Sequence, residues 1–357
     1  MGSVLRSKRT LAAILIVVVA VSVTGISLYG ITNVQRSNQL NSLMATYFFR
    51  AGSLRIVSQA PSITEMIFGL GLEDYMVGCT QYCDYPPKLA TMIASGKVDN
   101  SLDWFYPSAE AIVALRPTMV LLDAGVSAQV QLATSLQSQG IATYLVSRGN
   151  RIHEIESTIE QLGNLFAWVT LSQSGTAAQN LISRMETKIN NVQEKVSGQQ
   201  EVKVLYCVWI DFSANTLYTC GNQTFISEII QKAGGINIYY NNEQSWPSDT
   251  LALEKAAYTD PDVIIISDHF AFLNPVEVLS DMGSSRLKDT PAYPNRVYFI
   301  QGQADNLFCR PGPRVAEGVE LLAHILFPSL YNATFPDPYH VINDANYKNY
   351  LSSLILE

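Results

Sequence analysis

Two stretches of the chain follow one pattern: Ser108-Ala-Glu-Ala-Ile-Val-Ala-Leu-Arg-Pro-Thr-Met-Val-Leu-Leu122 and Ala252-Leu-Glu-Lys-Ala-Ala-Tyr-Thr-Asp-Pro-Asp-Val-Ile-Ile-Ile266. In each, a glutamate opens a short helix, a proline follows, and a buried strand begins after the proline. Proline ends a helix because it lacks an amide donor and disfavours helical geometry at the residue before it. The repeat predicts two similar lobes.

Strands and helices alternate around both stretches. The first half predicts strands at 54–58, 119–123 and 141–146, and helices from Ser62, from Ser108 and around 130–139. The second half predicts strands at 202–208, 262–266 and 296–300, and helices at 225–235 and 315–326. Such alternation is typical of parallel sheets covered by helices on both faces.

A helix is expected between the two halves. Apolar residues recur at helical spacing from Leu171 to Ser197, and no proline interrupts them. At 1.5 Å per residue this segment makes a rod of roughly 40 Å, which favours a bridge over an ordinary surface helix.

The N-terminus predicts export. Arg6, Lys8 and Arg9 precede an uncharged run from Thr10 to Ile31. A helix needs roughly 20 apolar residues to cross a bilayer, and this run is long enough. The basic cluster should stay in the cytoplasm and place the rest of the chain outside. A retained anchor is favoured over a cleaved signal peptide.

The composition of the chain limits which classes of partner it can bind. The net charge is −8, and no Lys/Arg-rich stripe lies beyond the N-terminus, which argues against nucleic acid. Five cysteines leave at least one unpaired, and Cys207 and Cys220 flank an expected hairpin that would bring them opposite each other. Cys79 and Cys83 have a spacing that suits metal, but two thiols do not make a site.

Catalytic motifs are missing. The four histidines are scattered, and there is no H-E-x-x-H, G-x-S-x-G or phosphate-binding glycine loop. His269 follows a buried strand, so it is expected either as an axial ligand to a metal or as a plain polar contact.

Aromatic and cationic side chains gather after the predicted strands, where ligands of open parallel sheets bind. Flat rings with a few donors suit a large, partly apolar, planar ligand, although core packing is the competing interpretation of each ring. The candidate ligand-binding residues are Tyr82, Tyr85, Trp104, Arg148, Trp209, Trp246, His269, Phe308 and Arg310.

Glu110 and Glu254 occupy the same place in the repeat. The helix dipole stabilises a carboxylate at a helix start, by about 0.3–1 kcal/mol, and this explains either glutamate alone. It does not require one in both lobes. A symmetric pair would give a partner two anionic docking points beside one shared groove.

The chain resembles the binding proteins that serve cobalamin, haem and ferric-siderophore ABC importers. The blocks that carry the resemblance, over about residues 53–330, are Arg55 to Glu65, Gly69-Leu-Gly71, Asp84-Tyr-Pro-Pro87, Glu110 to Pro117, Phe225 to Asn237, Glu254 to Ile266 and Pro311-Gly-Pro-Arg314. The resemblance implies an α/β fold of two Rossmann-like lobes joined by a long rigid bridging helix. The transmembrane helix expected from the apolar run at the N-terminus would precede this fold.

The resemblance also implies roles for residues. Glu110 and Glu254 match positions that form salt bridges to arginines of the permease dimer, which works with ATPase subunits. Tyr82 and Trp246 match positions that contact a corrin ring. A corrinoid is therefore favoured as ligand, then a ferric siderophore or haem. A free metal ion is disfavoured, and no resident cofactor is expected.

Two other functions remain open: a surface metal-chelatase-like enzyme, and a membrane-tethered sensor without transport. The expected boundaries are a basic end and anchor at 1–31, a polar stalk at 32–52, an N-terminal lobe at 53–169, a bridging helix at 170–198, a C-terminal lobe at 199–330 and a C-terminal extension at 331–357.

Overall fold

The computed structural model describes residues 54–356 except positions 168, 251, 270 and 337. The predicted anchor at 1–31 and stalk at 32–52 lie outside the described residues. Within the described part, no helix combines the length and apolar character that a membrane crossing requires. The chain forms two compact units: unit 1 holds the residues up to Arg148, His153–Ile182 and Leu356, and unit 2 holds Gly149–Ile152 and Ser183–Ile355.

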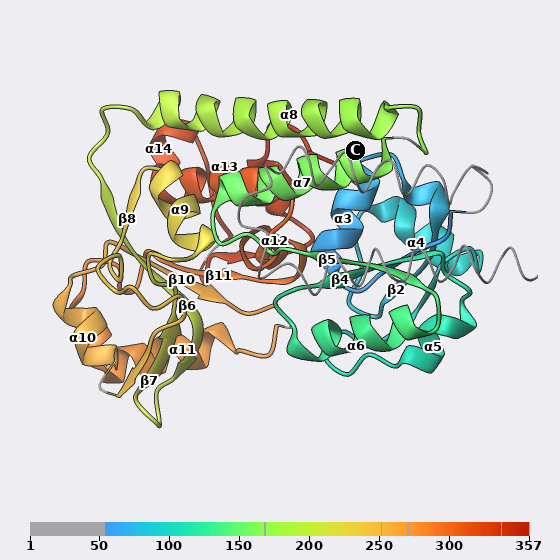
Figure 1. The fold of residues 1–357 in the computed structure, drawn as a ribbon. Helices are drawn as coiled ribbons and strands as arrows, with labels where there is room; N and C mark the ends of the chain where they lie inside the picture. The colour runs from blue at the N-terminus through green and yellow to red at the C-terminus, as the bar shows by residue number, and fades with distance from the viewer. Residues whose placement is uncertain (1–53, 168, 251, 270, 337, 357) are drawn as a thin grey trace, which may run out of the picture. The chain divides into compact units, whose positions relative to one another are not determined.

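Unit 1 is built on a five-stranded parallel sheet in the order β3-β2-β1-β4-β5. Its strands are β1 (Ile56–Ser58), β2 (Met76–Thr80), β3 (Asp99–Leu102), β4 (Met119–Asp123) and β5 (Ala142–Val146). Its helices are α3 (Pro61–Gly69), α4 (Pro87–Ala94), α5 (Ala109–Ala114), α6 (Ser127–Ser138) and α7 (Ile152–Phe166), with a 3₁₀ turn at Glu73–Tyr75. Figure 1 shows α5 and α6 on one face of the sheet and α3 on the other.

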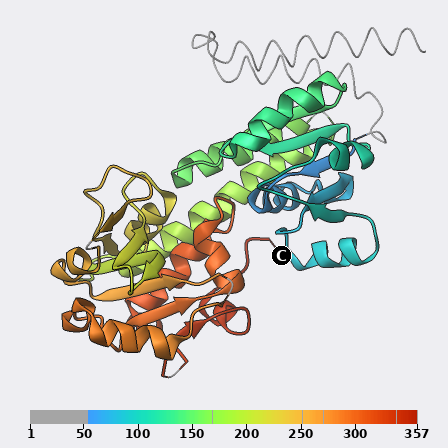
Figure 2. The ribbon, with the colours of Figure 1, turned by 90° about the horizontal axis from the view of Figure 1, so that it is seen from below.

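Unit 2 contains a seven-stranded sheet, of which β8, β6, β10, β11 and β12 pair in parallel and β7 and β9 continue as an antiparallel edge. Its strands are β6 (Val202–Asp211), β7 (Thr216–Thr219), β8 (Gly235–Asn237), β9 (Ser248–Thr250), β10 (Val263–Ser267), β11 (Val297–Ile300) and β12 (Val341–Ile342). Its helices are α9 (Phe225–Lys232), α10 (Ala252–Tyr258), α11 (Pro275–Ser284), α12 (Gly302–Cys309), α13 (Val315–Leu326) and α14 (Pro328–Tyr331), with 3₁₀ turns at Arg286–Asp289 and Tyr347–Tyr350. Helices cover both faces of this sheet (Figures 1 and 2).

The two units share a core topology. Strands β2-β1-β4-β5 of unit 1 have the same order and parallel direction as β8-β6-β10-β11 of unit 2. The backbone also repeats where the sequence does. Arg116 and Asp260, each directly before a proline, have φ of 52° and 50°. This left-handed conformation ends α5 and α10 because a residue before proline avoids the helical region.

The same hydrogen bonds anchor both repeats to the neighbouring strand. Thr118 donates its amide to the carbonyl of Arg55 at 2.9 Å, and Asp262 donates to Lys203 at 2.8 Å. In return, the amide of Arg55 donates to the Thr118 hydroxyl and the amide of Lys203 donates to the Asp262 carboxylate, both at 2.8 Å. The repeat in the sequence is therefore also a repeat in the fold.

Helix α8 (Gln173–Val196) has 24 residues and belongs to both units by sequence, since unit 1 ends at Ile182 within it. Leu181, Met185, Ile189 and Val192 are buried along one face, at the spacing the sequence predicts. The long helix in Figure 1 is therefore the one expected between the halves.

One expectation about cysteines is wrong. Cys207 and Cys220 do flank a β6–β7 hairpin, but both are free thiols. The strand register pairs Cys207 with Thr219, so Cys220 is one residue out of register. Because side chains alternate along a strand, the two thiols do not face each other as a cross-strand pair.

Candidate functional site

At the carboxyl end of the sheet in unit 1, the predicted residues Trp104 and Arg148 both contact Asp123, which was not predicted. Asp123 ends β4 and is buried, and its carboxylate accepts a hydrogen bond from Arg148 Nε at 2.8 Å and from Trp104 Nε1 at 3.2 Å. The Arg148 guanidinium lies over the Trp104 ring, 5.2 Å from its centroid. Charge pairing and the cation–π contact together fix the indole at the strand ends.

Further aromatic rings extend this cluster. Trp104 contacts Phe105 with ring centroids 4.6 Å apart, and Phe105 meets Tyr82 edge-on at 5.9 Å. The buried amide of Gln129 donates to the Trp104 carbonyl at 2.9 Å and so holds the loop after β3 in place. Tyr82, Trp104 and Arg148 remain partly exposed and Phe105 is half exposed, so unit 1 presents an aromatic surface with one cation.

Unit 2 presents a second aromatic surface on its antiparallel edge. Trp209 on β6 pairs in register with Tyr218 on β7, so the two side chains stand on the same face of the sheet. Trp209 is 57% exposed, Tyr218 44% and Trp246, in the loop before β9, 52%. Large rings exposed in one region of a sheet are typical of binding surfaces rather than of a core.

Three candidate residues are instead buried within their own units. Tyr85 is 3% exposed, and Phe308 is fully buried, with its ring 5.9 Å from that of Tyr206. Arg310, directly after α12, is also buried. These side chains belong to the interior of the units that carry them and are not part of either exposed aromatic surface.

His269 follows β10, as expected, and is 31% exposed. Its Nδ1 atom lies 3.4 Å from the carboxylate of Asp305, which is buried in α12. The Cys309 thiol, one helical turn further along, donates to the same carboxylate at 3.2 Å. A thiol, a carboxylate and an imidazole therefore meet at one point of unit 2.

Sequence reasoning missed the two aspartates that organise these clusters. For Asp123 a signal existed, since a carboxylate that ends the apolar strand 119–123 needs partners. For Asp305 there was none, because the sequence analysis predicted no helix at 302–309.

Glu110 and Glu254 are exposed in the first turns of α5 and α10. Ser108 caps α5 and donates its hydroxyl to Glu110 at 2.9 Å, while Asn215 donates its amide to both oxygens of Glu254 at 3.0 and 2.9 Å. The backbone amide of Glu110, and then the Ser108 hydroxyl, hold the pKa of the Glu110 carboxyl below its ordinary value. The carboxylate is thus the stable form at neutral pH.

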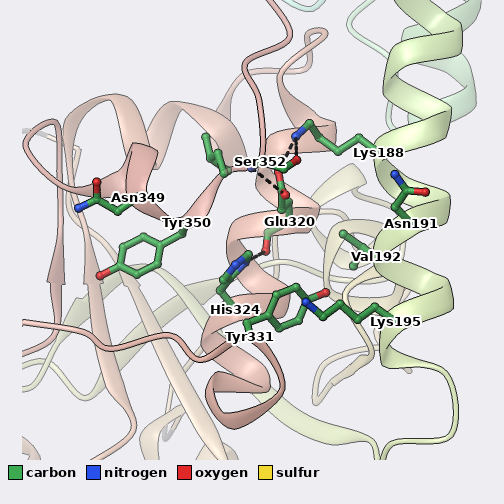
Figure 3. A pocket seen from close by; sticks show the side chains of 11 residues that line it. Lys188, Asn191, Val192, Lys195, Glu320, His324, Tyr331, Asn349, Tyr350 and Ser352 are labelled. Carbon is green, nitrogen blue, oxygen red and sulfur yellow. Dashed lines mark hydrogen bonds and ion pairs between the residues drawn. The ribbon is translucent and has the colours of Figure 1, made fainter.

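A separate cavity of about 390 Å³ lies in unit 2 between α8, α13 and the C-terminal segment (Figure 3). Glu320 binds Lys188 Nζ at 2.5 Å, and the Lys195 ammonium stands 3.9 Å from the centroid of the Tyr331 ring. Burial raises the pKa of Tyr331 to about 12. None of the ligand-binding or docking residues predicted from the sequence lines this cavity.

Comparison with known proteins places the chain in a family. A family profile described as "Periplasmic binding protein" matches residues 56–302. An ABC transporter substrate-binding lipoprotein, YvrC of Bacillus subtilis, is 27% identical over 285 residues, which cover 78% of this chain and 81% of the relative. A vitamin B12-binding protein of Photorhabdus laumondii is 26% identical and covers 61% of this chain and 72% of its own length.

Among solved structures, the periplasmic haem-binding protein HutB of Vibrio cholerae has a TM-score of 0.63 with 21% sequence identity, over 77% of this chain and all of HutB. At this identity the likeness shows a shared fold. With the profile matching more than half of the sequence, this chain belongs to the periplasmic binding protein family, and it is a binding protein rather than an enzyme.

Proposed function

We propose that this chain is the extracytoplasmic binding subunit of an ABC importer and that it captures a metal chelate, with a corrinoid ranked ahead of a ferric siderophore or haem. The observation that carries the proposal is that each unit exposes aromatic rings at the strand ends or sheet edge: Tyr82 and Trp104 in unit 1, Trp209 and Trp246 in unit 2. Exposed rings stack on flat ligands at little entropic cost. The vitamin B12- and haem-binding relatives support this class of ligand.

Arg148 adds the polar part of the proposed ligand surface. Its Nε bonds to Asp123 and its guanidinium lies over Trp104, so its position is fixed before a ligand arrives. Its side chain is 39% exposed. A fixed cation beside an exposed ring suits a chelate whose rim carries amide or carboxylate oxygens, since such oxygens accept hydrogen bonds from guanidinium.

The proposal predicts that ligand binding is visible by absorbance. Titration of the chain with cobalamin, haem and a ferric siderophore should give a saturable spectral change, with one ligand per chain by native mass spectrometry. Trp104→Ala and Trp246→Ala should each weaken Kd about tenfold or more, because truncating an aromatic anchor typically costs above 1–2 kcal/mol. Tyr258→Ala, at an exposed ring on α10 outside both surfaces, should leave Kd unchanged. If the chain forms a complex with none of the three chelates, the proposed ligand class is wrong.

We also propose that Glu110 and Glu254 dock the chain on its permease. They occupy equivalent repeat positions, both are exposed, and both are oriented by a neighbouring side chain. The double variant Glu110→Ala/Glu254→Ala should reduce uptake about tenfold or more and leave ligand Kd unaltered, since only the charge pairs with the partner are lost. Uptake is measured with labelled ligand in cells that express the transporter.

A matched control is Glu277→Ala. Glu277 is an exposed acid in the first turn of α11, a helix that lies outside the repeated stretches 108–122 and 252–266. Equal loss of uptake in this control would mean that general surface charge, not the glutamate pair, governs docking.

For localisation, we propose that the apolar run at 10–31 anchors the chain to the membrane. The full chain should then need detergent for extraction from membranes, whereas a chain lacking 1–31 should not.

A further inference from the structure

Three side chains of unit 2 that are able to ligate a metal converge at a point where the sequence singled out only His269, as an axial ligand or a polar contact. His269 follows β10, and Asp305 and Cys309 lie one turn apart on α12, next to β10 and β11 in Figure 1. One donor atom from each residue lies within 4.8 Å of the other two. The chain brings them together across two different elements, which is why no local motif announced them.

The geometry centres on a single oxygen. Asp305 Oδ2 lies 3.2 Å from Cys309 Sγ and 3.4 Å from His269 Nδ1. Tetrahedral Zn²⁺, with bonds of roughly 2.0–2.3 Å, places its ligands roughly 3.3–3.8 Å apart. The two distances from the carboxylate are thus already close to those between ligands of a bound ion.

The surrounding structure holds these donors in place. Ser267 Oγ donates to the other carboxylate oxygen, Asp305 Oδ1, at 2.5 Å and leaves Oδ2 toward the thiol and the imidazole. The backbone carbonyl of His269 accepts a hydrogen bond from Gly302 at 3.1 Å, which ties the histidine loop to the start of α12. Partners of this kind orient ligands and tune their affinity for metal.

The burial of Asp305 adds a reason for a cation. Its carboxylate is 1% exposed, whereas His269 is 31% exposed and Cys309 is exposed. A buried carboxylate is costly unless positive charge or hydrogen bonds compensate it. A divalent ion would approach from the side of the histidine and cysteine and meet the carboxylate behind them.

We propose that His269, Asp305 and Cys309 form a site for a divalent ion of borderline softness, with Zn²⁺ as the best fit. One thiolate, one imidazole and one carboxylate suit Zn²⁺, whereas Mg²⁺ and Ca²⁺ prefer oxygen ligands alone. Three protein ligands leave one position for water or for a donor atom of an incoming molecule. On binding, the ion takes the place of the thiol proton, which is released to solvent, so affinity rises with pH.

The test uses Co²⁺ as a spectroscopic substitute for Zn²⁺ in the full chain. One equivalent should bind, produce thiolate-to-cobalt charge-transfer absorption, and be displaced by Zn²⁺. Cys309→Ser keeps a group that can donate to Asp305 and should abolish the charge-transfer band. His269→Ala and Asp305→Asn should each weaken Co²⁺ binding about tenfold or more. His153→Ala, at an exposed histidine on α7, is the control and should bind as wild type.

Two results would overturn the proposal. One is the absence of stoichiometric Co²⁺ binding in the wild-type chain, which would leave the cluster as a hydrogen-bonded network. The other is a charge-transfer band that survives Cys309→Ser and disappears on substitution of Cys79 or Cys83, which would place the ion at that buried pair. Because the readout is metal alone, neither result bears on chelate capture or on docking.

Discussion

Asn215 adopts a left-handed backbone conformation, with φ of 51°, in the turn between β6 and β7. Its amide donates to both carboxylate oxygens of Glu254. Asparagine tolerates this conformation better than most residues, and glycine adopts it freely. One residue therefore combines a turn requirement with the orientation of a proposed docking carboxylate.

Two substitutions separate these roles. Asn215→Ala should destabilise the chain by about 1–2 kcal/mol, because alanine is strained in the left-handed region and the amide is lost as well. Asn215→Gly should stay within about 1 kcal/mol of wild type while releasing Glu254. Urea denaturation measures both. Equal stability of the two variants would show that the turn does not depend on this backbone geometry.

His324 links stability to pH. Burial lowers its pKa from the ordinary 6.5, the nearby Lys195 and Lys188 act in the same direction, and Glu320 opposes them. Because the pKa of His324 is lower in the folded chain than in the unfolded chain, the unfolded chain binds more protons at pH values between the two. The contribution of His324 is therefore present above pH 6.5 and lost as pH falls through the folded pKa. His324→Gln should flatten this part of the stability profile, measured by urea midpoints on both sides of that pH.

Cysteine reactivity gives a second residue-scale prediction. Burial raises the pKa of the Cys207 thiol, and it raises the pKa of the Cys220 thiol to about 12. The pKa of the Cys79 thiol is raised chiefly by its hydrogen bond with Cys83. Of the five, only Cys309 is exposed. The native chain should show one fast-reacting thiol toward a disulfide reagent, lost in Cys309→Ser. Two or more fast thiols would contradict the burial of the other four.

At the scale of elements, α8 shows what periodicity can and cannot predict. The apolar spacing predicted a helix at 170–198, and the structure has it at Gln173–Val196 with Leu181, Met185, Ile189 and Val192 buried. Lys188 is also buried there, which no local pattern indicates, because its partner Glu320 lies on α13. Amphipathic helices are set by near neighbours in sequence, whereas a buried ion pair depends on which helices meet.

Removing one partner of the Lys188–Glu320 ion pair should destabilise unit 2 more than replacing both partners with apolar residues. Lys188→Ala should destabilise unit 2 by about 3–5 kcal/mol, because it leaves the Glu320 carboxylate buried without its cation. The double variant Lys188→Met/Glu320→Met should recover much of this loss, since apolar groups need no partner. A double variant as unstable as the single one, by urea denaturation, would locate the loss in packing instead.

The candidate site was predictable to a similar extent. Trp104 and Trp246 lie in loops as expected, whereas Trp209 lies within β6. All three side chains are at least partly exposed, and their contact with a ligand stays a prediction. Phe308 was misjudged because it was taken as a loop residue, whereas it lies inside α12 and packs in the core. The His269–Asp305–Cys309 cluster needed tertiary structure, since β10 and α12 bring it together. The sequence indicates where loops are, but not which side of an unpredicted helix faces inward.

At the scale of the whole molecule, the C-terminal extension is part of the fold of unit 2. The sequence assigned no role to 331–357, yet β12 within it pairs with β11 and extends the sheet. Ile342 and Ile355 are buried. Two buried carboxylates of α13 depend on it: Glu317 accepts from the amide of Ile355 at 2.6 Å and Glu320 from that of Ser352 at 3.0 Å.

Removal of 332–357 should therefore unfold unit 2 or bring it close to unfolding. Burying two isoleucines is worth about 3–6 kcal/mol, and domains are stable by only about 5–15 kcal/mol in total. The deletion also leaves the two α13 carboxylates without their amide donors, which adds a desolvation cost. Thermal melting and limited proteolysis measure the effect, with Asn349→Ala, an exposed residue of the same segment, as the control. A truncated chain that melts and resists protease like wild type would mean that the segment only covers a surface already stable without it.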